Sequence, residues 1–461
     1  MVNSLIKFCD FIGEFFMKLF RNLSPTRIIA LSFALVILVG TILLSLPVAT
    51  RTGEGTNIID ALFTATSATC VTGLAVCDTY THWSMFGQIV IMCLCQVGGL
   101  GFMSFMSLFS IFLHKKIGLH ERLLLVQSSG HIRLSGVVKL IKGIFIGTIS
   151  FELIGAIFLT IAFYPEMGLG KSIYYGIFHS ITAFCNAGFD LMGFRVPYSS
   201  LTYYETNPLV ILTISALIVI GGMGFFVWSD VLKNRFKFSK YSLHSKIVIY
   251  STAVLLLGGW FLYYMFELKG NLYDLSYPDK ILSSLFMSVS TRTAGFAATD
   301  FSQMSEAGAL LTMCLMFIGG GAGSTAGGIK TTTIAVLFMT VMAFAKGKKE
   351  VVIFKKRIDN DTIRHSAAIF LVYMVAVILG TAIICVTDPI GLKESLFETI
   401  SAIGTVGYSM IGTQNLSDLA HIVLIVLMYG GRIGFMSLMM VFWENENKEQ
   451  IQRPVEKIMI G

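Results

Sequence analysis

Eight long apolar runs restrict what this chain of 461 residues can fold into. Several are longer than the roughly 20 apolar residues that an α-helix needs to cross the hydrocarbon core of a bilayer. Only 13% of the residues are charged, which is about half the share found in soluble proteins. We therefore expect an all-α membrane protein. The runs cover residues 27–48, 83–113, 137–164, 208–232, 245–266, 307–344, 364–386 and 419–443.

Within each successive pair of runs lies a shorter amphiphilic stretch, which is too brief to span a bilayer. The four stretches cover residues 57–68, 171–183, 280–290 and 392–402. Each carries an aromatic residue, then a hydroxyl residue (Ser67, Thr182, Ser290 and Ser401), then a loop glycine (Gly73, Gly188, Gly295 and Gly407). The loop glycines lie 115, 107 and 112 residues apart, as two spans and a re-entrant loop would require. The pattern predicts eight transmembrane helices in four pseudo-fourfold helix, pore-loop, helix repeats around one central pore.

The predicted repeats divide the chain into residues 26–115, 116–235, 236–346 and 347–461. Before them, residues 1–25 place Phe8, Phe11, Phe15 and other apolar side chains at helical spacing, with charged residues off that stripe. This favours an interfacial amphipathic helix on the cytoplasmic side. A disordered tail is the alternative.

The distribution of Lys and Arg sets the expected orientation. We count 25 basic residues at the N-terminus, after each second span and at the C-terminus, but only six on the opposite side. The sequence therefore predicts a multi-pass protein of the plasma membrane with both termini in the cytoplasm. The four loops then enter from outside, where carboxylates such as Asp78 and Asp190 would concentrate cations.

The loops have the chemistry of an ion filter. Filters of potassium channels use main-chain carbonyl oxygens in place of the hydration shell of the ion, and glycine lets the backbone turn those carbonyls inward. Taken singly, each loop could be a helix-capping turn; four equivalent loops favour a ring of carbonyls. The candidate potassium-binding residues are Val71, Thr72, Gly73, Asn186, Ala187, Gly188, Thr293, Ala294, Gly295, Thr405, Val406 and Gly407.

With these four loops, the whole chain resembles the Trk/Ktr/HKT superfamily of potassium transporters. It is most similar to the Ktr type, because the two additional N-terminal spans of the Trk type are missing. The resemblance implies potassium uptake through a single-chain pore. Sodium-permeable plant relatives carry serine at the first filter position, where this chain has Gly73. The resemblance further implies a homodimer on a cytosolic KtrA-type ring of nucleotide-binding regulatory subunits, with sodium as an added activator.

A second repeat follows in the later spans, as Gly98-Gly99-Leu100-Gly101, Gly221-Gly222-Met223-Gly224, Gly320-Gly321-Ala322-Gly323 and Gly431-Arg432-Ile433-Gly434. Close helix packing explains most of these glycines. Arg432, however, stands about 20 Å into its span, where a charge is costly. It either pairs with a buried carboxylate such as Glu398 or projects into the aqueous cavity beneath the filter, where it would slow permeation.

The run from Ala307 to Phe344 would form a helix of about 57 Å, far longer than a bilayer core of about 30 Å. Its glycine-rich middle has little helix propensity, so we expect a break at residues 318–330. The resemblance to the superfamily implies that this segment is an intramembrane gating loop. A kink without function is the alternative. The gating candidates are Gly320, Gly321, Gly323, Ser324, Thr325, Gly327, Lys330 and Arg432.

Other functions are disfavoured by what the sequence lacks. A membrane enzyme acting on lipid or isoprenoid substrates needs clustered carboxylates, histidines or a metal site, and no such cluster is evident. A pore with sodium as its main cargo conflicts with Gly73. We expect no organic cofactor on this chain, no catalytic residues and no nucleic-acid partner. The basic loops at 233–246 and 346–364 fit either ordinary positive-inside charge or a docking surface for the regulator.

Overall fold

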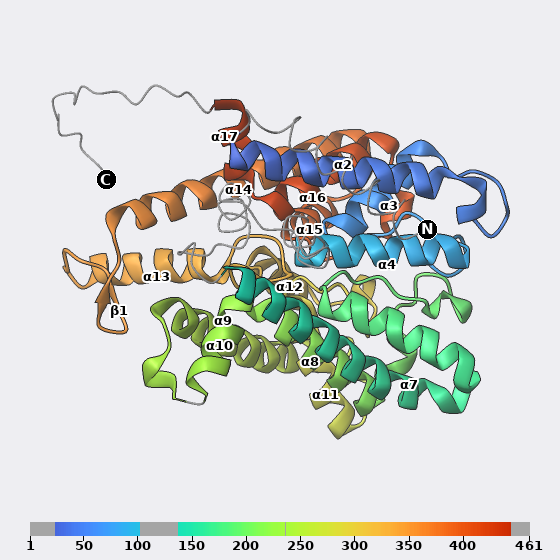
Figure 1. Ribbon diagram of the computed structural model, residues 1–461, viewed down its shortest axis with the longest axis horizontal. Helices are drawn as coiled ribbons and strands as arrows, with labels where there is room; N and C mark the ends of the chain where they lie inside the picture. Colours follow the sequence, from blue (N-terminus) through green and yellow to red (C-terminus); the bar gives the residue numbers. More distant parts are fainter. Residues whose placement is uncertain (1–23, 102–136, 236, 444–461) are drawn as a thin grey trace.

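The computed structural model describes residues 24–101, 137–235 and 237–443, and nearly all of its regular structure is helical (Figure 1). The one sheet in this part of the chain pairs β1 (Val352–Ile353) with β2 (Lys356–Arg357). The predicted amphipathic helix at residues 1–25 lies almost entirely outside the described residues. The all-α expectation is confirmed.

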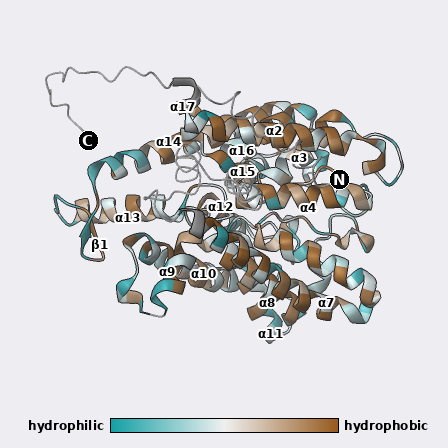
Figure 2. Cartoon of the chain, in the orientation of Figure 1, coloured by the Kyte–Doolittle hydropathy of each residue, from teal (hydrophilic) through white to brown (hydrophobic). Residues whose placement is uncertain are grey.

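Four helices of the described chain are long and apolar enough to cross a membrane: α2 (Pro25–Ser45), α7 (Val137–Phe184), α10 (Leu243–Glu267) and α14 (Asn360–Thr387). A bent pair, α8 (Pro208–Met223) and α9 (Phe225–Asn234), would make a fifth span. Apolar residues run along the helices and hydrophilic ones gather at both ends of the molecule (Figure 2). This is the distribution that a bilayer around the middle of the molecule requires.

Shorter buried helices lie between the long ones and end inside the molecule. They are α3 (Ile58–Thr69), α11 (Tyr277–Ser290) and α15 (Leu392–Gly404), together with the last part of α7. Helix α7 is broken at Gly168, whose φ of 71° and ψ of 170° are not helical, so residues 169–184 form a separate short helix. All four match the amphiphilic stretches seen in the sequence.

The helices pack as units of three that follow one another around the molecule. Within the units, α2 packs on α3 and α4 (Met85–Leu100), α10 on α11 and α12 (Glu306–Phe317), and α14 on α15 and α16 (Asp418–Ile433). Helix α7 packs likewise on α8. Between the units, α4 contacts α7, α8 contacts α11, α12 contacts α15, and α16 contacts α3. The last contact closes the circle, because it joins the end of the chain to its beginning.

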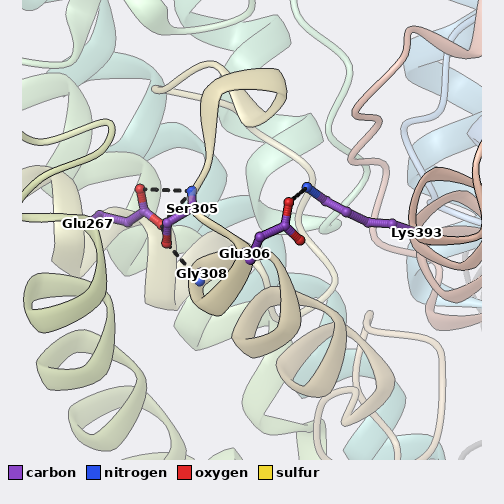
Figure 3. Close-up of polar contacts among 5 residues, drawn as sticks. All are labelled: Glu267, Ser305, Glu306, Gly308 and Lys393. Carbon is purple, nitrogen blue, oxygen red and sulfur yellow. Dashed lines mark hydrogen bonds and ion pairs between the residues drawn. The ribbon is translucent and has the colours of Figure 1, made fainter.

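In two of the units, a carboxylate at the end of the first helix fixes the start of the last helix. Glu267, at the end of α10, accepts hydrogen bonds from the amide of Ser305 (3.1 Å) and from its hydroxyl (2.6 Å), while Ser305 caps the Gly308 amide (Figure 3). In the last unit Asp388 binds Ser417 in the same way, at 2.7 and 2.8 Å. Each carboxylate thereby joins the first helix of its unit to the third.

An ion pair in the same view joins two units. The Lys393 amine lies 2.8 Å from a Glu306 carboxylate oxygen (Figure 3). The Glu306 side chain is 83% exposed, so this pair contributes little to stability.

The last helices of the units depart from the sequence expectation of continuous spans. Helix α8 meets α9 at a bend of 93° at Gly224, and α16 is separated from α17 (Phe435–Trp443) at Gly434. Helix α4 ends at Leu100, before Gly101. The φ angles of these three glycines lie between 82° and 97°, which an α-helix cannot contain. Glycine at these positions therefore ends helices, a role that close packing alone did not predict.

The break predicted within residues 307–344 is present. Helix α12 ends at Phe317, α13 (Thr331–Ala345) begins after Lys330, and the backbone between them is not helical. Gly323 in this segment again has a positive φ, of 70°. We call residues 318–330 the intramembrane segment.

Candidate functional site

The four glycine loops have one backbone conformation. Each has a positive φ at its glycine, and another two residues earlier. The earlier residues are Val71, Asn186, Thr293 and Thr405, with φ between 51° and 67°. Left-handed backbone is unfavourable for valine and threonine, which adopt it only where the surrounding structure enforces it, and asparagine tolerates it better. When left-handed and right-handed backbone conformations alternate, successive carbonyl groups turn toward one side of the loop.

The four loops touch one another in a closed ring. A Cβ atom added at Gly73 would lie 2.5 Å from the carbonyl oxygen of Ala187 and 3.0 Å from the Cα of Gly188. One at Gly188 would meet the carbonyl of Ala294, and one at Gly295 the carbonyl of Val406. One at Gly407 would meet the carbonyl of Thr72, which returns to the first loop. Only glycine allows this approach of backbone to backbone.

The hydroxyl residues of the short helices hold the loops in place. Ser67 accepts a hydrogen bond from the Gly73 amide (3.1 Å) and donates one to the carbonyl of Leu74 (2.7 Å). Ser401 accepts likewise from the Gly407 amide (3.2 Å), and Ser290 donates to the Phe296 carbonyl (2.7 Å). The backbone carbonyls of Ser67, Thr182, Ser290 and Ser401 accept from the residue just before each loop glycine. Three of the four hydroxyls therefore bond to their loops, whereas the Thr182 hydroxyl donates to the Phe178 carbonyl within its own helix.

Three further side chains support the loops and were not predicted from the sequence. Glu398, fully buried on α15, accepts hydrogen bonds from the hydroxyls of Ser409 and Thr413, just beyond the last loop. His179 Nε2 accepts from the amide of Leu191, and Tyr408 donates to the Phe296 carbonyl at 3.0 Å. A buried charge on an amphiphilic helix beside a loop was the available signal for Glu398, since such charges need nearby donors.

The intramembrane segment is bonded to the backbone of other units as well as to its own. Its Gly321 amide donates to the carbonyl of Gly222 (2.9 Å), and its Gly328 amide donates to that of Gly431 (3.1 Å). In return, Phe225 donates to the carbonyl of Gly323 (2.9 Å). Gly222 and Gly431 lie at the glycine-rich ends of α8 and α16, and Phe225 begins α9. The glycine motifs of three units therefore meet in the middle of the molecule.

Arg432 does not pair with Glu398, so that alternative is wrong. Its guanidinium donates hydrogen bonds to the carbonyls of Gly98 and Gly99 at the end of α4, and to that of Thr325 in the intramembrane segment. The distance to the Gly99 oxygen is 3.0 Å. The ends of helices carry unpaired carbonyls with partial negative charge, which explains how a cation is tolerated here without a carboxylate.

The other two cations at membrane depth also face carbonyl groups. Lys330 donates to Ala326 within the intramembrane segment, at 2.7 Å. Arg292, beside the third loop, reaches the carbonyl of Gly319 at 3.5 Å. Three other glycines pack against the ends of the short helices: Cβ atoms added at Gly98, Gly221 and Gly431 would collide with the carbonyls of Thr69, Phe184 and Ile403. Here close packing is the reason for glycine.

Comparison with known proteins agrees with this architecture. The family model for the cation transport protein TrkH matches residues 22–452. The chain belongs to the TrkH family of cation transport proteins. The resemblance seen in the sequence is therefore confirmed, and the protein is a multi-pass membrane transporter rather than an enzyme.

Similar proteins cover nearly the whole transporter. It is 41% identical to the "Potassium/sodium uptake protein NtpJ" of Enterococcus hirae, over 96% of this chain and 98% of that protein. It is 40% identical to the "Ktr system potassium uptake protein B" of Bacillus subtilis, over 95% and 97%. The crystal structure of the potassium transporter TrkH from Vibrio parahaemolyticus superposes with a TM-score of 0.68 at 20% identity, covering 89% of this chain and 85% of that one. This last likeness shows the shared fold.

Proposed function

We propose that the chain takes up potassium ions across the plasma membrane through a single pore lined by the four glycine loops. The observation that carries the proposal is the closed ring of contacts from Gly73 through Gly188 and Gly295 to Gly407. Carbonyl groups crowded around one axis offer a dehydrated cation the oxygens that it loses with its water. The names of the relatives in Enterococcus hirae, a potassium/sodium uptake protein, and in Bacillus subtilis, a potassium uptake protein, both include this ion.

The arrangement behind the pore is then four equivalent units and eight crossings, with both termini in the cytoplasm. The cyclic packing of the units supports fourfold equivalence. Helices α4, α8 and α16 and the pair α12 and α13 would make the four remaining crossings, although each of these helices is short. The loops then enter from outside, and the intramembrane segment lies on their cytoplasmic side.

The intramembrane segment would serve as the gate. Its bonds to α8 and α16 come from elements that could separate, and its glycines allow a second conformation at low cost. Arg432 joins this segment to α4 and would keep it closed. A cytosolic nucleotide-binding ring of the KtrA type, docked on a homodimer of this chain, would shift the balance between the two conformations. The relatives named as Ktr system proteins B and D support such a system.

Sodium is the second candidate cargo, because one relative is named a potassium/sodium uptake protein. A role as activator beside potassium is the alternative to transport. The ring supports potassium as the main cargo. A ring with glycine in all four loops keeps carbonyl oxygens alone toward the ion, whereas a serine hydroxyl would add a ligand and disturb the neighbouring loop.

The test is Gly73→Ser in proteoliposomes that contain only the purified chain. The new Cβ would press on the Ala187 carbonyl, so we expect potassium-over-sodium selectivity to fall by about tenfold, or about 1.4 kcal/mol. Gly53→Ser is the matched control, because Gly53 has a similar φ of 74° but no neighbouring atom within 4 Å. Unchanged selectivity in Gly73→Ser, with the control also unchanged, would refute the filter.

A further inference from the structure

A cavity of about 440 Å³ lies where α13, α14 and the β1–β2 hairpin meet. Its lining includes the basic residues Lys348, Lys349 and Arg357 and the apolar residues Ala343 and Ile363. The hairpin and the end of α13 extend beyond the helix bundle at one end of the molecule (Figure 1). Nothing in the proposed pore uses this cavity.

The basic side of the cavity rests on a fixed backbone. Helix α13 is capped by Gly347, whose φ is 65°, and the Lys348 amide donates to the carbonyl of Ala343 at 2.9 Å. The hairpin is closed by a hydrogen bond of 2.9 Å from the Ile358 amide to Val351. Ile353 and Ile358 are buried in a small core with Ile247 of α10. The two lysines are therefore held at the cavity by the packing of their segment.

The charge of the cavity is positive. Glu350 is its only lining carboxylate, and it is paired with Arg357 at 2.8 Å. Neither Lys348 nor Lys349 has an ion pair with any described residue. The nearby Asp359 is engaged as the cap of α14, where it accepts from the Thr362 amide at 3.0 Å. Two cationic side chains thus remain for an anionic ligand.

The rim of the cavity is apolar and continues toward the bilayer. Phe344, which lines the cavity, is 85% exposed, and Val341 and Phe338 on the same helix are 66% and 64% exposed. Such exposed side chains along one helix fit hydrocarbon better than water. A ligand that satisfies both sides has an anionic head and an apolar tail.

We propose that this cavity binds the phosphate of an anionic phospholipid, with the acyl chains against Phe338, Val341 and Phe344. Basic pockets between membrane helices at the cytoplasmic surface recognise lipid headgroups in this way. The proposal relies on the membrane orientation given under the proposed function but not on the transported ion. Since α13 follows the intramembrane segment directly, the lipid would anchor the far end of the helix that leaves the gate.

The experiment compares two double variants in nanodiscs that contain phosphatidylcholine with a minor share of phosphatidylglycerol. Lys348→Gln with Lys349→Gln removes two charges from the cavity. Lys355→Gln with Lys356→Gln removes two charges from the same hairpin, outside the cavity lining. Phosphatidylglycerol retained by each protein is counted by native mass spectrometry after gentle extraction. We expect about tenfold weaker retention in the first variant and no change in the second.

Every other outcome overturns the proposal. Equal loss in both variants would mean diffuse attraction to a negative surface, and no loss in either would mean no site. Full displacement of the lipid by inorganic phosphate would assign the cavity to a free phosphate compound. If the first variant kept its lipid but lost binding to a soluble regulatory protein, the cavity would be a protein-docking surface. Because no transport is measured, failure here leaves the proposed pore untouched.

Discussion

The ring of loops and the intramembrane segment are built of similar glycine-rich backbone but are held in different ways. In the ring, each loop is bonded to its own short helix, as when Ser67 holds Gly73 and Leu74. The intramembrane segment takes many of its bonds from other units, such as those of Gly222 and Gly431. Local bonds survive any movement between units, whereas bonds between units break with it. The rigidity of each region therefore depends on whether its hydrogen-bond partners lie in the same unit or in another one.

The largest effect should come from filling the ring. In Gly407→Ala the new Cβ would collide with the carbonyl of Thr72, and the φ of 98° is strained for alanine. We expect selectivity for potassium over sodium, measured by competitive uptake into proteoliposomes, to fall by about a hundredfold, or about 2.7 kcal/mol. Gly53→Ala, with a φ of 74° and open space around it, should behave as the unchanged chain. The same loss in both variants would trace the effect to backbone strain rather than to the ring.

Releasing the intramembrane segment should have the next largest effect. Arg432→Gln removes the charge that binds the carbonyls of Gly98, Gly99 and Thr325. Each charge-assisted bond contributes about 1.5 to 3 kcal/mol, partly offset by the cost of burying the charge. We expect basal potassium uptake without any regulator to rise by about tenfold at unchanged selectivity.

Arg364→Gln is the control for this prediction, since it removes an exposed arginine of α14 that does not line the cavity beside the hairpin. Size-exclusion chromatography checks that both variants are folded. A folded Arg432→Gln chain with reduced uptake would show that the arginine opens the pathway rather than closes it.

Two serines with equal numbers of local bonds compare what the two regions do. Ser67 accepts from Gly73 and donates to Leu74 in the ring; Ser324 accepts from Ala326 and donates to Gly321 in the segment. Replacing either with alanine leaves two backbone groups unsatisfied, at about 1 to 3 kcal/mol. Ser67→Ala should lower selectivity by about fivefold, and Ser324→Ala should instead raise basal uptake about threefold. Identical phenotypes in the two assays would remove the distinction between the regions.

The smallest expected effect is a loss of thermal stability at low pH. Burial alone would raise the pKa of Asp388, but hydrogen bonds from Thr387 and from the amide and hydroxyl of Ser417 lower it below its ordinary value. A lowered pKa in the folded state stabilises the last unit above about pH 4 and loses that stability as the pH falls further. We expect the thermal midpoint of the chain to drop below about pH 4, and Asp388→Asn to flatten this drop. An exposed carboxylate variant, Asp361→Asn, should keep the full dependence.

The local features of the site could be predicted from the sequence, because they rest on residue types with few conformational choices. The loop glycines, their hydroxyl partners and the break at residues 318–330 all follow from short motifs. Helix boundaries at Gly224 and Gly434 were missed because an apolar run gives no sign of a bend when the glycine at its middle also serves packing. The spacing of apolar residues predicts which side of a helix is buried, but not where the helix bends.

Contacts between units could not be predicted. The partners of Arg432 are backbone carbonyls, and every residue has one, so the sequence offers no distinguishing signal. Glu398 was a reasonable partner by charge alone, but its acceptors are satisfied by the hydroxyls of Ser409 and Thr413. The order of the loops around the ring likewise depends on how whole units pack. In the sequence, the only sign of the cavity beside the β1–β2 hairpin was the basic charge of residues 346–364.

The contact between Gly407 and Thr72 has a consequence for how the protein is made. These residues are separated by most of the chain, so the ribosome releases the first loop long before the fourth exists. A nascent chain inserted up to α13 carries three loops and a ring that is open on one side. The pore proposed above would therefore be complete only when the last unit is inserted.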